Sequence, residues 1–147
     1  YAETIMDFKP QKENEKAGLL IFQNEQHYYF LAQTIKNGKP YIELIKSAGK
    51  EGNGETILAS QELRSSKKPL QLKIEANGNN YSFYYAEKNK PYQLLLDNVD
   101  ARFLSTARAG GFVGSLLALY GTSNGQSTNN AAHFRWFKYK GDDEVYK

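Results

Sequence analysis

Short stretches in which apolar and polar residues alternate constrain the fold of this chain more than any other feature. Between positions 70 and 76, Leu, Leu, Ile and Ala occupy every second position, with Gln, Lys and Glu between them. Successive side chains of a β-strand point to opposite faces, so this pattern predicts a strand with one face in a core and the other in water. No stretch keeps the period of about 3.6 residues that an amphipathic helix requires. The sequence therefore predicts an all-β protein.

Turn-forming pairs connect the predicted strands. Asn77-Gly78 lies between the strand patterns 70–76 and 81–85. Both residues tolerate the positive φ angles of a type I′ turn, so we expect these two strands to form an antiparallel hairpin. Asn37-Gly38 plays the same part in an earlier hairpin.

Two segments, residues 18–22 and 116–120, are apolar at nearly every position. Such runs are typical of central strands that are covered on both faces. About ten strand patterns follow one another at the spacing typical of sandwiches. The predicted architecture is an antiparallel two-sheet β-sandwich.

Composition excludes several function classes. The 147 residues fit one domain, and 19 Lys and Arg residues against 16 Asp and Glu residues leave a formal charge of +3. The basic residues are interleaved with acids, so we expect no nucleic-acid partner. No apolar run is long enough to span a membrane, and we expect no membrane partner. The absence of cysteine fits a cytoplasmic protein as well as a periplasmic or secreted bacterial one.

The Gly-Thr-Ser-Asn-Gly pattern at 121–125 formally matches the nucleophile elbow of α/β-hydrolases. That elbow needs a strand before the serine and a helix after it, so that the hydroxyl is exposed. Here a polar stretch, 126–130, leads into another strand pattern. We interpret residues 121–125 as a plain turn.

The two histidines and the acidic residues do not form a recognisable reactive set. His27 and His133 lack a second ligand at short spacing, whereas zinc needs three or four protein ligands, so we expect no metal or cofactor. His27 is interpreted as a surface or groove residue. Glu43 takes a solvent-facing strand position, and Asp97-Asn98 is typical of a turn. We therefore expect no catalytic residue in this chain.

Aromatic residues offer a better clue, because pyranose rings present apolar faces to them. Phe112 stands in the glycine-rich stretch 110–114 and is the main candidate for contact with a ligand or with an active site. An alternative is that its ring folds back as a lid on the sandwich. His27 and Tyr29 are further candidates, whereas the alternation around Trp136 predicts a core position for that ring.

Three longer segments carry a more specific pattern, namely residues 17–31, 70–85 and 100–139. The third segment contains, in order, Leu104-Ser105-Thr106, Gly110-Gly111-Phe112, Gly114, Leu119-Tyr120, Asn124-Gly125-Gln126, Ala132-His133-Phe134 and Trp136-Phe137. Together these segments resemble the C-terminal concanavalin-like domain of family 43 glycoside hydrolases of the β-xylosidase type. The chain departs from the usual family pattern at Tyr92, Val113 and Arg135, where Trp, Thr and Asp are common.

The resemblance implies a concanavalin A-like jelly roll in which residues 1–140 form one accessory module without its first strand, followed by a polar tail at 141–147. It implies a parent β-xylosidase or α-L-arabinofuranosidase whose catalytic acids lie in an upstream five-bladed β-propeller. The sandwich would pack on that propeller, and Phe112 would help to close the pocket around xylo-oligosaccharides. Contact with xylan is a second implied role.

Two other interpretations remain open from the residues alone. The chain could be an independent carbohydrate-binding module or lectin-like domain, which would bind soluble xylan by itself. It could also be an autonomous hydrolase, although the sequence shows no convergent pair of carboxylates.

Overall fold

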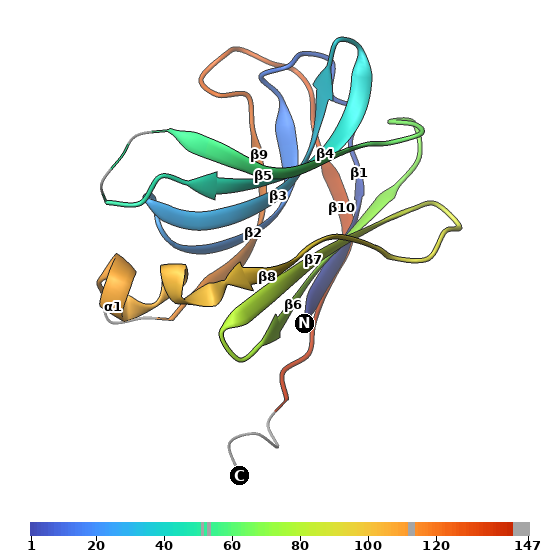
Figure 1. Cartoon of the computed structure of the whole chain (residues 1–147). Coiled ribbons are helices and arrows are strands. Elements are labelled where there is room, and N and C mark those ends of the chain that lie inside the picture. Colours follow the sequence, from blue (N-terminus) through green and yellow to red (C-terminus); the bar gives the residue numbers. More distant parts are fainter. Residues whose placement is uncertain (51, 53, 112–113, 143–147) are drawn as a thin grey trace.

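Two five-stranded antiparallel sheets face each other in a computed structural model that describes residues 1–50, 52, 54–111 and 114–142 (Figure 1). The first sheet, here called sheet A, has the order β10 (His133–Tyr139), β1 (Ala2–Asp7), β6 (Leu70–Asn77), β7 (Asn80–Glu87) and β8 (Gln93–Asp100). The second, sheet B, has the order β5 (Glu55–Glu62), β4 (Lys39–Ser47), β3 (His27–Lys36), β2 (Lys16–Asn24) and β9 (Leu116–Thr122). The predicted β-sandwich is confirmed.

The core lies between the inner faces of the two sheets. Leu72, Ile74 and Phe83 of sheet A meet Leu31 and Leu44 of sheet B, and all five are at most 2% exposed. The predicted strand 70–76 therefore has its apolar face in the core, as its alternation indicated, except for Ala76 at its end, which is exposed. Burial of this apolar surface is the main driving force for joining the two sheets.

The two asparagine-glycine hairpins differ. In the β3–β4 hairpin, Lys36 pairs with Lys39, and both loop residues have positive φ, 51° for Asn37 and 76° for Gly38. This confirms a turn of the predicted kind. In the β6–β7 hairpin Asn77 pairs with Asn80, and only Gly78 of the two loop residues has a positive φ. The hairpin was predicted correctly, but the type I′ turn centred on Asn77-Gly78 was wrong.

Asp97-Asn98 is not a turn. Both residues lie inside β8, where Asn98 has a φ of 53° and the register with β7 shifts between Tyr81 and Phe83. The pair therefore belongs to a β-bulge, which an asparagine accommodates because it tolerates the left-handed region. The turn prediction for this pair was wrong. The turn predicted at 121–125 is right only in part, because β9 continues to Thr122 and the turn is closed by a hydrogen bond from the Gln126 backbone to the Ser123 carbonyl oxygen.

Two segments that were expected to be buried lie instead in edge strands and are exposed. β9 is an edge strand, and Leu116 and Tyr120 are 57% and 45% exposed, so the expectation of a central strand at 116–120 was wrong. β10 is the edge strand of sheet A, and Trp136 is 39% exposed instead of buried in the core. The segment 18–22, in contrast, lies in β2 between two neighbours and is largely buried.

Glu43 was expected to face water, but its side chain is fully buried on the outer face of sheet B. A second apolar cluster there includes Phe30 and Ile45. The ammonium groups of Lys16 and Lys36 pair with the Glu43 carboxylate and shield it. The outer face of this sheet is therefore covered by its own side chains.

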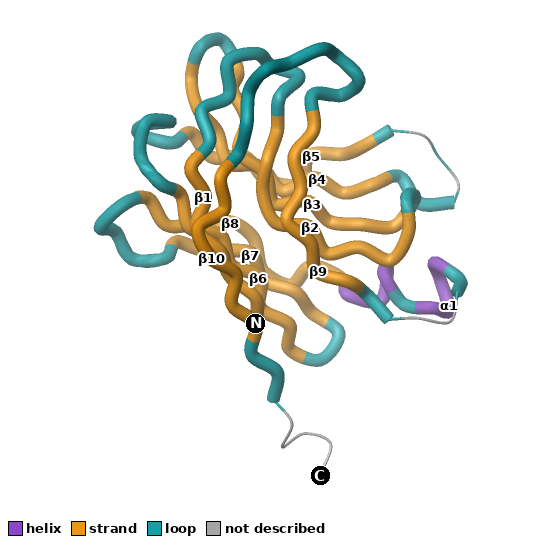
Figure 2. Tube along the Cα trace, turned by 180° about the vertical axis from the view of Figure 1, so that it is seen from behind, coloured by secondary structure: helices purple, strands orange, loops and turns teal. Residues whose placement is uncertain are grey.

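A 3-10 turn at Ala101–Leu104 and the short helix α1 (Thr106–Ala109) connect β8 to β9. They lie at one end of the sandwich, beside the turns that join neighbouring strands of sheet B (Figures 1 and 2). Within the part of the chain that the structure describes, no helix is long and apolar enough to cross a membrane.

Candidate functional site

The segment from Asp100 to Gly111 leads into the predicted Phe112 loop, and its own hydrogen bonds shape it. Asp100 caps the 3-10 turn by accepting a hydrogen bond from the Arg102 backbone at 2.9 Å. The guanidinium groups of Arg102 and Arg108 bind its two carboxylate oxygens at 2.9 and 3.2 Å. The hydrogen bond from the Arg102 side chain is the largest cause that lowers the pKa of Asp100. The Asp100 carboxylate is therefore ionised and already bound by two arginines.

Phe103 holds the segment against sheet B. Its ring centroid lies 4.9 Å from that of His27 and 5.5 Å from that of Tyr29. The ammonium group of Lys46 lies 4.3 Å from the Phe103 centroid, within the range of a cation–π contact. Residues from β3, β4 and the 3-10 turn thus meet at one aromatic ring.

Two amide side chains fix the far end of the segment. Gln23 Nε2 donates to the carbonyl oxygen of Gly110 at 3.2 Å, and Asn24 Nδ2 donates to that of Ala109 at 3.0 Å. Gly110 and Gly111 have φ angles of 81° and 88°, which favour glycine. The backbone at Ala109 and Gly110 is thereby held by side chains of β2.

His27 is 3% exposed, so its predicted surface or groove position was wrong. Its Nδ1 lies 3.0 Å from Asn24 Oδ1, and burial, followed by the charge of Lys50, lowers its pKa. The ring is neutral at pH 7 and acts in packing. His27 is the first residue of β3, and its side chain lies on the inner face of sheet B, the same face as Tyr29 two residues later. This places the ring under Phe103.

Tyr29 is 1% exposed and lies in the core. Its hydroxyl donates to the Asp100 carbonyl oxygen at 2.8 Å, and burial raises its pKa far above the ordinary value. Neither Tyr29 nor His27 presents a surface to a ligand in this chain; both support the segment above them. Phe112, the remaining candidate, lies outside the described residues.

We name this cluster the Phe103 end, and define it by Asn24, His27, Tyr29, Phe103 and Gly110. Asp100, the carboxylate next to this cluster on the 3-10 turn, is bound by two arginines. No group of three His, Asp or Glu side chains suited to a metal ion occurs among residues 1–50, 52, 54–111 and 114–142. The arrangement can hold the segment that precedes residue 112 in a fixed position.

Sequence reasoning missed the residues that build this end. Asn24 follows an apolar strand pattern and precedes Glu25-Gln26, and asparagine is common in turns because its side chain bonds to nearby backbone. This pattern could have identified Asn24 as a turn residue. Gln23 and Phe103 carried no such signal, because their partners lie 87 and more than 70 residues away. Only the paired sheets bring these groups together.

Fold and site together define a concanavalin-like β-sandwich that presents one anchored loop. The family model of the beta xylosidase C-terminal concanavalin A-like domain matches residues 1–140, and the chain belongs to this family. The resemblance inferred from the sequence is confirmed.

Curated relatives agree. The non-reducing end alpha-L-arabinofuranosidase BoGH43B of Bacteroides ovatus is 30% identical over 139 residues, which are 95% of this chain and 25% of that protein. A xylosidase/arabinosidase of Butyrivibrio fibrisolvens is 31% identical over 133 residues, 90% of this chain and 24% of that protein. The chain therefore spans about a quarter of the length of these relatives.

Solved structures show the same fold. Xyloglucan PUL GH43B of Bacteroides ovatus superposes with a TM-score of 0.83 at 27% identity, over 95% of this chain and 26% of that one. The xylan beta-1,4-xylosidase of Bacillus halodurans C-125 gives a TM-score of 0.84 at 20% identity, over 95% of this chain and 27% of that one, and supports the fold alone.

Proposed function

We propose that this chain is the non-catalytic accessory module of a xylan-degrading glycoside hydrolase, a β-xylosidase or α-L-arabinofuranosidase. In this role it packs on a catalytic domain, a five-bladed β-propeller, and presents the loop that contains Phe112 to the mouth of the active site. The family match and the relatives' names support the class of parent enzyme.

One observation carries the positioning role. The backbone on the near side of the loop is bound by two β2 side chains at Gly110 and Ala109, and Phe103 packs the preceding 3-10 turn against His27. A surface loop without function has no need of such fixation, whereas a loop that completes another domain's pocket must be held in place. Closure of that pocket would exclude water and favour short substrates.

The absence of catalysis is tested on the isolated chain with aryl β-xylosides and aryl α-L-arabinofuranosides. We expect no turnover. Hydrolysis that survives purification and scales with protein concentration would overturn the assignment as an accessory module.

The positioning role is tested in the parent hydrolase with xylobiose as substrate. Phe112→Ala should raise KM or lower kcat, and Asn24→Ala should shift the same parameter by a smaller amount. Phe137→Ala, on the exposed edge strand β10, is the matched control and should leave the kinetics unchanged. Unchanged kinetics for both Phe112→Ala and Asn24→Ala would refute the role of the loop.

A further inference from the structure

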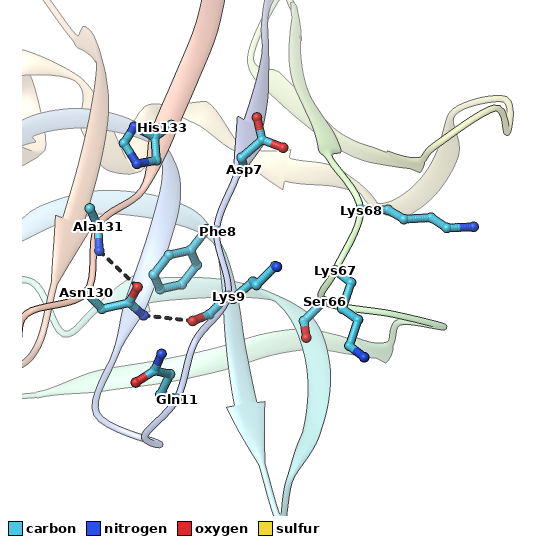
Figure 3. Close-up of a pocket in the computed structure, with 10 residues that line it drawn as sticks. All are labelled: Asp7, Phe8, Lys9, Gln11, Ser66, Lys67, Lys68, Asn130, Ala131 and His133. Atoms are coloured by element: carbon cyan, nitrogen blue, oxygen red, sulfur yellow. Dashed lines mark hydrogen bonds between the residues drawn. The ribbon is translucent and has the colours of Figure 1, made fainter.

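The opposite end of the sandwich contains a small pocket that the proposed function does not use. It has a volume of about 210 Å³ and lies between the end of β1, the segment before β6 and the segment before β10 (Figure 3). Phe8, Lys9, Ser66, Lys67, Asn130 and His133 are among its lining residues. Since a water molecule occupies about 30 Å³ in the liquid, the space corresponds to roughly seven waters. That is comparable to a single sugar ring with its hydroxyl groups.

A buried carboxylate behind this pocket holds two of its walls together. Glu15 is 3% exposed and accepts hydrogen bonds from the Gln11 and Lys12 backbone, from Thr128 Oγ1 at 2.5 Å and from Asn130 Nδ2 at 3.0 Å. Asn130 Nδ2 also donates to the Lys9 carbonyl oxygen at 2.7 Å, as Figure 3 shows. The loop after β1 and the loop before β10 are therefore fixed to each other. A pocket with fixed walls costs a ligand little ordering entropy.

The lining is cationic. Lys9, Lys67 and Lys68 line the pocket, and Asp7 is its one acidic lining residue. Arg135 already binds both Asp7 oxygens, at 2.5 and 3.1 Å. Lys9 extends from the end of β1 toward the segment that carries Ser66, while the Lys67 and Lys68 side chains extend away from it (Figure 3). The Lys9 ammonium group is therefore placed to meet a negatively charged ligand, and Lys67 and Lys68 add positive charge at the rim.

We propose that this pocket binds a pyranose unit that carries a carboxylate, such as a hexuronate side group of a polysaccharide. The carboxylate would pair with the Lys9 ammonium group, and the ring hydroxyls would exchange hydrogen bonds with Ser66, Gln11 and His133. The largely buried Phe8 ring supplies an apolar surface beside Asn130. This site goes beyond the proposed function and does not depend on it.

The chemistry of the lining favours a sugar acid over phosphate. Phosphate sites typically use arginine forks or successive backbone amides, and the arginine nearest this pocket is occupied by Asp7. Lysine ammonium groups with hydroxyl and amide side chains around an apolar patch suit a carboxylated ring that also presents hydroxyls. A bare oxyanion would leave most of the 210 Å³ unfilled.

The test is a titration of the 147-residue chain, followed by amide shifts in two-dimensional NMR spectra. The probes are a xylo-oligosaccharide with one glucuronyl side group and the same oligosaccharide without it. We expect saturable shifts at Lys9, Ser66, Ala131 and neighbouring amides for the acidic probe, with millimolar affinity that weakens as salt is added. The neutral probe should bind at least tenfold more weakly.

Variants locate the charge contact. Lys9→Gln should weaken binding of the acidic probe by about fivefold, as expected for a partly exposed ion pair, and Lys67→Gln, at the rim, by about twofold or less. Lys39→Gln, at the start of β4 and outside the pocket lining, is the control and should not change affinity. Equal binding of both probes, equal shifts with acetate or phosphate, or no shifts at these amides would each overturn the proposal.

Discussion

The two ends of the sandwich fasten their loops by different chemistry. At the Phe103 end, neutral amides and aromatic rings hold the segment that leads to Phe112. At the other end, here called the Glu15 end and defined by Phe8, Glu15, Thr128 and Asn130, one ionised carboxylate joins two loops. The same fold thus relies mainly on packing and neutral amides at one end, beside the exposed pairs of Asp100 with two arginines, and on a buried carboxylate at the other, so acid should weaken the two ends in different pH ranges.

Removing the Glu15 carboxylate should have the largest effect. Burial alone raises the pKa of Glu15, but the hydrogen bonds from Thr128, Gln11, Asn130 and Lys12 outweigh it and bring the pKa from 4.5 to about 2. That shift corresponds to about 3 kcal/mol of stability at pH 7. Glu15→Ala should lower the free energy of unfolding by about this amount in urea denaturation.

The matched control is Glu13→Ala, because Glu13 is a nearby, exposed glutamate whose Oε1 accepts a hydrogen bond from the Asn37 amide. It should cost less than about 1 kcal/mol. Because the folded pKa of Glu15 is lowered, its contribution is complete above pH 4.5 and is lost as the pH falls toward 2. Glu15→Gln should lack this part of the acid dependence, and a retained dependence would contradict the assignment.

Phe103→Ala should come next, with a loss of about 2 kcal/mol. The ring packs against His27 and Tyr29 and is only partly buried, so the cost lies below that of a core phenylalanine. Thermal or urea unfolding measures this loss of stability. Phe103→Leu is the conservative control and should lose less than half as much. An equal loss for both variants would contradict this and would mean that the stacked ring, and not apolar burial, carries the contribution.

Protonation of His27 should have a smaller effect on stability. Burial and the Lys50 charge lower its pKa from 6.5, so the unfolded chain takes up a proton first. Stability attributable to this group is complete above about pH 6.5 and falls as the pH drops below that value. Unfolding curves at pH 7.5 and 5.5 should differ less for His27→Gln than for the unaltered chain, and an identical difference would refute the prediction.

The smallest global effect should follow from Asn24→Ala. It removes the hydrogen bond from Asn24 Nδ2 to the Ala109 carbonyl oxygen and those of Asn24 Oδ1 with the Gln26 backbone and the His27 ring, in an exposed or partly buried setting where water can replace them. We expect a loss of about 1 kcal/mol or less in unfolding, but faster hydrogen exchange at residues 105–111. Asn14→Ala is the matched control, because Asn14 Nδ2 donates to the Ser123 carbonyl oxygen at the Glu15 end. In Asn14→Ala, hydrogen exchange should become faster near residue 123 and not near residue 109. The reverse pattern would contradict the conclusion that the two ends are fixed independently.

Much of the framework was predictable. The alternation at 70–76 and the pair Asn37-Gly38 predicted a strand and a turn correctly, because both depend on neighbours within a few residues. The family resemblance came from short motifs in order along the chain, and the family match confirms it. Predictions that depended on strand order failed, as Trp136 and the segment 116–120 show.

The candidate site was predicted less well for the same reason. His27 and Tyr29 are residue types that can contact a sugar, but both lie beneath Phe103. No local pattern predicts this contact. Glu15 resembled an ordinary loop glutamate, because its side-chain partners Thr128 and Asn130 lie more than 110 residues away.

The sequence by itself determined the two-sheet sandwich, its hairpins and its family, since side-chain alternation and turn chemistry are local properties. The tertiary structure decided which strands lie at the edges, which aromatic rings are buried and which carboxylates are bound. Those outcomes depend on contacts between residues far apart in the chain, which exist only once the sheets have paired and stacked.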